Sequence, residues 1–437
     1  MSDTLLLCPR PLARCAGRLL LLPLLPQRPP LKPLPSEIWS EVFSFVLSES
    51  LAANPLADRA RLCMSLVMVC RSFKDVALPL MYGRIKIRTV SCLDKLSTCL
   101  CAADQKWDSI RRIPYSTPGR WVQVLDLSEL ADTVDSRLVY TVDLLLTNLF
   151  PLVPFLTKLC LTPAVPLSRR VFSSLTNRDG NSNLRSLGGI CYDASFHSPV
   201  ATGGDPFVRL LQRCYNLERL EIIGRGFDSD FESFPDALFQ EPASTVKLFL
   251  PKLHSLTILS MPTSSLLVSL LDTRLPRLRA LSITPYDDIP YPASCTSRFL
   301  DVHGQSIFTL SFFTPKSWPT LLHPSPSTLF HTCPNLRHLS LEYPLPELAL
   351  PDSTLPTLPL QIVSIPRPDM RFWRVLERLL PYLPSLKAVR IRDVRWLDPG
   401  MSNRAQETGV QGELRNWRRR LGRRGIRVLD ADWQDMR

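Results

Sequence analysis

One apolar pattern recurs along most of this chain, and it limits the possible folds more than any other feature. The clear copies read Leu-x-x-Leu-x-Ile or a close variant and begin at Leu217, Leu253, Leu278, Leu336 and Leu386. Weaker copies begin at Val122, Leu156, Leu184, Ile307 and Leu360, and successive copies start 24 to 36 residues apart. Recurrence at about this period is typical of repeat proteins, whose repeats stack on their neighbours to share one core.

Each copy predicts a short strand, because its last two apolar residues alternate and therefore point to one side. Turn signals precede the copies, for example at 214–216 and 383–385, and amphipathic runs such as 206–213 and 370–380 precede the turns. The chain has 41 prolines against 16 glycines, and proline interrupts helices. We therefore expect helix, proline turn and strand in each repeat, with parallel strands on an inner face and helices outside. The alternative is one irregular α/β domain.

A different pattern occupies residues 34–84, where three short amphipathic helices are expected. The first, in LPSEIWSEVFSFVL (34–47), has two apolar stripes: Ile38, Val42 and Phe45 on one side, and Trp39, Phe43 and Val46 on the next. The second carries Leu62, Leu66 and Val69 on one face; the third carries Phe73, Val76, Ala77 and Leu80 and is limited by Pro79. Three such helices enclose a very small core, and a unit of this kind usually needs a partner surface.

These three helices resemble the F-box family. The match begins at Leu34-Pro35-x-Glu37-Ile38 with Val42 and Phe43, and it resumes at Leu66-x-x-Val69-Cys70-Arg71-x-Phe73-Lys74, followed by Ala77, Leu80 and Tyr82. The link between the first two helices, residues 48–60, is longer than in the family. Family members use this unit to dock the Skp adaptor of Skp–cullin–F-box ubiquitin ligases. The resemblance therefore implies an adaptor-binding surface made of Leu34, Pro35, Ile38, Val42, Val69 and Phe73.

The repeats resemble the leucine-rich repeats of F-box proteins, although the asparagine that usually follows the strand is missing from most copies. The chain as a whole is similar to mushroom-type fungal F-box proteins. The fold class implied is α/β: a small three-helix F-box at 34–84, followed by a leucine-rich-repeat-like solenoid, or horseshoe, at 85–400. A Pro/Leu-rich leader at 1–33 and a basic cap at 401–437 complete the expected organisation.

The residue between the last two apolar positions of each copy, and the residue two places earlier, are expected on the inner strand face. In the five clear copies these side chains are mostly small and uncharged, and the charged or titratable ones are Arg219, Glu221, His338 and Arg390. Such a surface suits a protein target recognised by shape and a few hydrogen bonds, and it suits nucleic acid poorly. We therefore expect these four residues to contact a protein target.

No catalytic, phosphate-binding or dinucleotide fingerprint occurs, so an enzyme is not expected. His331, Cys333 and His338 lie close in sequence. His331 is expected at the end of a helix and His338 in a strand, so the three do not have the spacing of metal ligands. No metal site and no cofactor are therefore predicted. The expected function is substrate recognition for a Skp–cullin–F-box ligase, with cullin reached through the adaptor. The alternative is a repeat scaffold that never joins a ligase.

The formal net charge of +12 is concentrated at the two ends. Residues 1–33 and 401–437 each carry a net charge of +4, which leaves +4 for the 367 residues between them. The Arg-rich tail, with Leu414, Trp417 and Leu421 at helical spacing, predicts a helix and a last strand (426–429) that cap the solenoid. A nuclear-import signal or a phosphate-binding patch are its alternatives.

The leader could be a targeting segment or a disordered segment. No apolar run reaches the length of a membrane helix, so no membrane association is expected. The expected location is cytoplasmic, nuclear or both.

Overall fold

The computed structural model describes residues 34–48, 55–105, 117–133, 136–192, 205–224, 247–261, 265–284, 295–314, 328–342, 348, 357–396 and 409–435. The chain divides into two compact units, Met1–Ala77 and Leu78–Arg437, which we call the N-terminal unit and the sheet unit. The predicted leader at 1–33 lies outside the described residues.

The N-terminal unit is built from α1 (Ser36–Ser48), α2 (Pro55–Val67) and the first half of α3 (Arg71–Gly83). Three aromatic rings form the centre of its small core: the ring centroids of Trp39 and Phe73 lie 4.8 Å apart, and those of Phe43 and Phe73 lie 5.0 Å apart. Phe43 is buried, and buried Leu47 lies one turn further along α1. One stripe of α1 therefore faces the interior, as the two-stripe pattern predicts.

Three details of these helices differ from the prediction. Leu47 continues the inner stripe in place of Val46, which is 43% exposed, because Leu47 lies four residues from Phe43 and so almost above it on the helix. α2 ends at Val67, which places Val69 in the link to α3. α3 continues through Pro79 to Gly83, so this proline removes one backbone donor without ending the helix.

The described residues of the sheet unit form one sheet of twelve parallel strands in chain order, so each of these strands pairs only with its sequence neighbours. The strands are β1 (Arg84–Lys86), β2 (Val124–Asp126), β3 (Lys158–Cys160), β4 (Ser186–Tyr192), β5 (Arg219–Gly224), β6 (Ser255–Leu259), β7 (Ala280–Ile283), β8 (Thr309–Phe312), β9 (His338–Ser340), β10 (Ile362–Ile365), β11 (Ala388–Ile391) and β12 (Arg427–Leu429). All ten predicted repeat copies contain a strand, and each strand begins two residues after the first apolar residue of its copy. The expected mixed α/β fold with a parallel sheet is confirmed.

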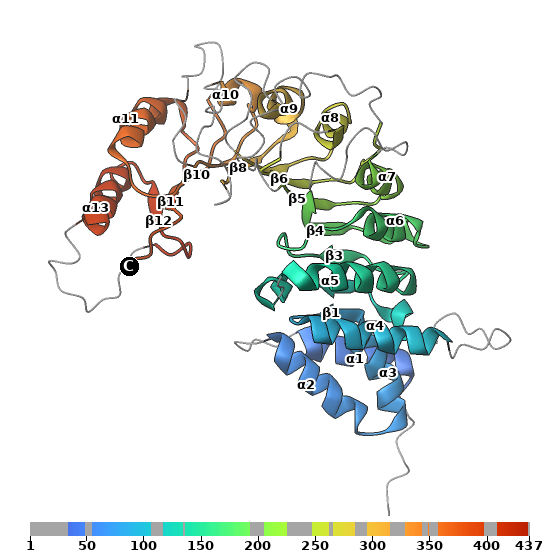
Figure 1. The fold of residues 1–437 in the computed structure, drawn as a ribbon. Coiled ribbons are helices and arrows are strands. Elements are labelled where there is room, and N and C mark those ends of the chain that lie inside the picture. The colour runs from blue at the N-terminus through green and yellow to red at the C-terminus, as the bar shows by residue number, and fades with distance from the viewer. Residues whose placement is uncertain are drawn as a thin grey trace, which may run out of the picture. The chain divides into compact units, whose positions relative to one another are not determined.

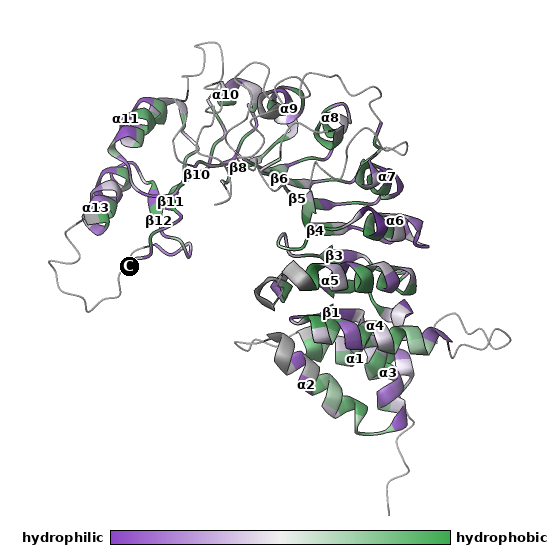
Figure 2. Ribbon diagram, in the orientation of Figure 1, coloured by the Kyte–Doolittle hydropathy of each residue, from purple (hydrophilic) through white to green (hydrophobic). Residues whose placement is uncertain are grey.

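Helices connect most of the strands and lie along one side of the sheet (Figure 1). They are α4 (Val90–Gln105), α5 (Ser136–Leu149), α6 (Arg169–Asn177), α7 (Pro206–Arg213), α8 (Ser265–Leu271), α9 (Cys295–His303), α10 (Leu329–Thr332), α11 (Met370–Leu379) and α13 (Gly409–Gly422). Most of them have an apolar and a polar side, seen as green and purple in Figure 2. The apolar sides and the inward residues of the strands form one continuous core from Ile87 to Val428.

The three apolar positions of each copy occupy this core; in β5, for example, Leu217, Leu220 and Ile222 are all buried. A backbone ladder just before the strands holds neighbouring repeats in register. The carbonyl of Glu218 accepts hydrogen bonds from the N–H groups of His254 (2.9 Å) and Ser255 (3.2 Å), and the same pair of bonds recurs at most other repeat junctions. Since the ladder uses backbone groups alone, it tolerates the irregular repeat length.

The last repeat consists of α13 and β12, which pairs in parallel with β11. Leu414, Trp417 and Leu421 are buried, as their helical spacing predicts. The Trp417 ring lies 5.0 Å from Trp373 and 6.4 Å from Phe372, centroid to centroid. The tail therefore covers the apolar end of the array.

Candidate functional site

Apolar side chains lie exposed along the outer stripe of α1. Leu34, Ile38, Val42 and Phe45 are 41% to 61% exposed and follow one another at three- or four-residue spacing. Pro35 is exposed beside them and ends the chain segment that leads into α1. A stripe of large apolar residues that faces water on so small a unit is typical of a protein-docking surface.

The other two residues predicted to bind the adaptor behave differently from each other. Val69, in the link between α2 and α3, is 63% exposed and is preceded by exposed Met68. Phe73 is half-buried and packs against Trp39 and Phe43 inside the unit. Phe73 can therefore support the docking surface by holding α1 against α3.

The strand face carries the four residues predicted to bind a target, and the structure places them in two pairs. Arg219 and Glu221 are exposed on β5 and point to the same side. His338 lies on β9 and Arg390 on β11. Three strands separate β5 from β9, which at about 4.8 Å per spacing puts the pairs roughly 19 Å apart. The strands between them present small residues: Ser255, Thr257, Ala280, Ser282, Thr309 and Ser311.

The second pair is engaged by the chain's own C-terminal turn. Arg390 donates a hydrogen bond to the carbonyl of Ala431 (2.5 Å), and its guanidinium lies 4.2 Å from the centroid of the Trp433 ring. The Nε2 of His338 lies 2.9 Å from Ser364 Oγ. Burial, together with the positive charge of Arg390, holds the pKa of His338 below its usual range, so this histidine is neutral at pH 7. In this structure, therefore, the pair on β5 is the more accessible one.

A buried carboxylate builds that C-terminal turn. Asp430 accepts hydrogen bonds from the backbone N–H groups of Asp432 (2.9 Å), Gln434 (2.8 Å) and Trp396 (3.2 Å). Trp433 sits at its tip with φ +63° and is 45% exposed. Sequence analysis did not identify Trp433 as a surface residue of the strand face; the Asp-Ala-Asp turn at 430–432 was the available signal.

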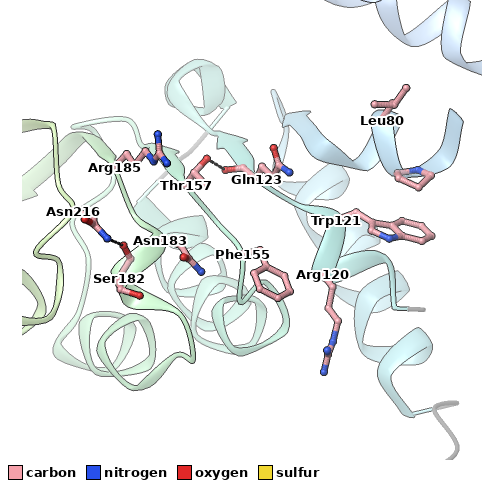
Figure 3. Close-up of a pocket in the computed structure, with 11 residues that line it drawn as sticks. Leu80, Arg120, Trp121, Gln123, Phe155, Thr157, Ser182, Asn183, Arg185 and Asn216 are labelled. Atoms are coloured by element: carbon pink, nitrogen blue, oxygen red, sulfur yellow. Dashed lines mark hydrogen bonds between the residues drawn. The ribbon is translucent and has the colours of Figure 1, made fainter. Parts of the chain in front are cut away.

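A groove of about 730 Å³ lies at the residues that precede β2 to β5 (Figure 3). Trp121 and Phe155 supply its aromatic surface and Arg120 and Arg185 its positive charge, and its described lining residues include no carboxylate. The close-up shows two hydrogen bonds between adjacent repeats, from Thr157 Oγ1 to the Gln123 carbonyl (2.9 Å) and from Asn216 Nδ2 to the Ser182 carbonyl (2.8 Å). These two side chains therefore add hydrogen bonds between adjacent repeats to those of the backbone ladder.

Groups with metal-binding or nucleophilic chemistry do not gather in the described part of the chain. No cluster of three or more His, Cys, Asp or Glu side chains is arranged to hold a metal ion there. Burial raises the pKa of the Cys214 thiol to about 12 and that of Cys333 to about 11, so both are protonated at neutral pH. None of the described helices combines the length and the apolar character of a membrane span.

Comparison with known proteins gives little more. No protein-family model and no curated protein matches the sequence. Among solved structures, a chain from the crystal structure of the yeast Rad7 and Elc1 complex is similar, with a TM-score of 0.30 and 13% sequence identity. The similarity covers 85% of this chain and 94% of that one, and it is weak.

Proposed function

We propose that this chain is the substrate-recognition subunit of a Skp–cullin–F-box ubiquitin ligase. In this proposal the N-terminal unit docks the Skp adaptor, and the strand face of the sheet unit binds a protein target. The observation that carries the proposal is the exposed apolar stripe of α1, formed by Leu34, Ile38, Val42 and Phe45.

The stripe has the chemistry that docking requires. An amphipathic helix that offers residues at three- or four-residue spacing can insert them into an apolar groove of a partner. Each large side chain that becomes fully buried in this way contributes about 1.5–3 kcal/mol. The interior of the N-terminal unit uses the opposite stripe, so docking requires no rearrangement of its core.

The chain's own part in ubiquitin transfer would be positional. A target held on the strand face is kept near the conjugating enzyme that the ligase recruits, and proximity raises the rate of reaction without a catalytic residue here. The alternative is a scaffold whose N-terminal unit binds some other protein. The ligase subunit is expected to assemble with a cullin through the adaptor, whereas the scaffold is not, so assembly with a cullin distinguishes the two.

We expect Ile38→Ala to weaken binding of the full chain to a recombinant Skp adaptor by roughly tenfold or more, since truncating a hot-spot side chain costs about 2 kcal/mol or more and about 1.4 kcal/mol corresponds to tenfold. Calorimetric titration of the purified chain with the adaptor measures this. The control is Leu144→Ala, which removes a leucine that is 60% exposed on α5, outside the N-terminal unit. Equal binding by all three proteins would rule out the adaptor-docking role.

A second prediction concerns the target surface. Exchanging the charges of the β5 pair, with Arg219→Glu and Glu221→Arg, is expected to reduce target capture by roughly tenfold while adaptor binding is unchanged. Quantitative mass spectrometry of co-purifying proteins, with the proteasome inhibited, measures capture for wild type and variant.

The matched control exchanges Arg185 and Glu218, whose side chains form an ion pair of 3.8 Å just outside the strand face. A protein is identified as a target if it co-purifies with the wild type, with the control variant and with Ile38→Ala, but does not co-purify with the β5 exchange variant. Proteins lost equally with both exchanges would contradict binding at the strand face.

A further inference from the structure

The outer surface at the C-terminal end of the sheet unit is strongly basic. α11 and α13 lie next to each other there (Figure 1), and both turn their aromatic residues inward. The outward positions are held largely by arginine: Arg371, Arg374 and Arg378 on α11, and Arg419, Arg420, Arg423 and Arg424 at the end of α13. Capping the array requires the buried side of α13 but gives no reason for this charge.

A groove of about 440 Å³ runs between the two helices within this basic surface. Its walls are formed by Trp373, Glu377, Leu380, Arg420, Leu421, Arg423 and Arg424. Among its described lining residues are three arginines and one glutamate, which give the groove a net positive charge. Its volume is within the range of sites that bind small ligands or short chain segments.

The groove is partly preorganised. The guanidinium of Arg420 lies 5.2 Å from the centroid of the Trp373 ring, a stacking contact that limits its rotamers. The indole of Trp373 is 5% exposed, and its Nε1–H has no acceptor among the described residues. Arg423 and Arg424 follow the last turn of α13, where the negative end of the helix dipole favours cations. Little side-chain entropy would be lost when Arg420 binds a ligand.

The geometry distinguishes among polyanionic partners. Single-stranded nucleic acid needs exposed aromatic rings to stack its bases, whereas Phe372, Trp373 and Trp417 are buried. A membrane surface needs apolar residues that insert beside the cations, and the exposed apolar residues of these helices, Met370 and Val410, lie at their opposite, N-terminal ends. A duplex is too wide for a groove of this size. An extended peptide fits, and guanidinium forks bind carboxylates in bidentate geometry.

We propose that the groove between α11 and α13 binds an acidic, extended segment of a partner protein, with Arg420, Arg423 and Arg424 pairing with its carboxylates. This site is distinct from the adaptor surface and from the strand face. It would give the chain a second contact with a target or with another subunit.

The test is a fluorescence-anisotropy titration of the full chain with a labelled peptide of alternating glutamate and glycine. We expect saturable binding that weakens as salt is added. The triple substitution of Arg420, Arg423 and Arg424 by glutamine is expected to lower affinity at least about tenfold. Replacing the same three by lysine keeps the charge but removes the bidentate fork, and we expect an intermediate loss.

The matched control replaces Arg371, Arg374 and Arg378 by glutamine, which removes equal charge from α11 outside the groove. The loss of peptide affinity in this control is expected to stay below about threefold, because salt screens the interaction between exposed charges on α11 and a peptide bound in the groove. Circular dichroism checks that each variant is folded. Equal losses from both triples, or no binding by wild type, would overturn the proposal. Tighter binding of duplex DNA or of phosphatidylserine vesicles at the same salt would overturn the peptide assignment.

Discussion

Replacing Gly189 with alanine is expected to lower the stability of the sheet unit by roughly 2–5 kcal/mol, as the sum of backbone strain and overpacking. Gly189 has φ +65°, a region that costs an L-residue about 1–2 kcal/mol. A Cβ atom there would also lie 2.0 Å from the carbonyl oxygen of Leu161 in the neighbouring repeat. The glycine occurs where β4 bulges against β5, between the register positions of Leu187 and Ile190.

Substitutions at two other glycines allow the effects of backbone strain and of overpacking to be measured separately. Gly425 has φ +72° but open space around its Cβ position, so Gly425→Ala should show the strain alone, about 1–2 kcal/mol. Gly422 has neither problem, and Gly422→Ala in α13 should be neutral or slightly stabilising. Thermal unfolding followed by circular dichroism measures all three. A Gly189→Ala loss no larger than that of Gly425→Ala would show that the repeats can move apart to accommodate the methyl group.

The strands could be predicted from sequence because their signal is local and repeated. Leu220 and Ile222 alternate within one short segment, and a proline turn such as that at 383–385 marks where the strand can begin. The same pattern gave the inward side of each strand and hence the exposed positions of Arg219 and Glu221. Irregular repeat length did not obscure it, since the ladder that joins repeats is made of backbone groups.

The rest depended on contacts between distant segments. The engagement of Arg390 by Trp433 joins residues more than forty positions apart, and nothing in the β11 copy itself indicates it. The basic groove likewise needs α11 and α13 side by side, although the arginine run alone had indicated a charged tail. On α1, the two-stripe pattern identified the exposed residues, but it placed Val46 where the helix puts Leu47.

Replacing Trp417 with alanine is expected to remove about 3–5 kcal/mol, the usual loss when a large aromatic side chain is deleted from a core. The Trp417 ring on α13 is 2% exposed and packs against α11, where its centroid lies 5.0 Å from that of the Trp373 ring. In a linear array each repeat contacts only its neighbours, so the loss should be confined to the end of the chain. Hydrogen exchange should accelerate in α13, β12 and β11, while the amides of β5 to β7 remain protected.

The control is Trp433→Ala, which removes an exposed ring and a cation–π contact with Arg390 of about 0.5–1 kcal/mol, and should leave hydrogen exchange in α13 unchanged.

Gly189→Ala should give a different pattern, because that substitution acts at β4 and should accelerate hydrogen exchange on both sides of an internal junction. Loss of α13 packing would also release Trp373 and Arg420, so the Trp417 variant should lose the acidic peptide while it keeps the adaptor. If exchange instead accelerated uniformly from β1 to β12, the sheet unit would unfold as one cooperative body, and α13 would be a core element and not an end cap.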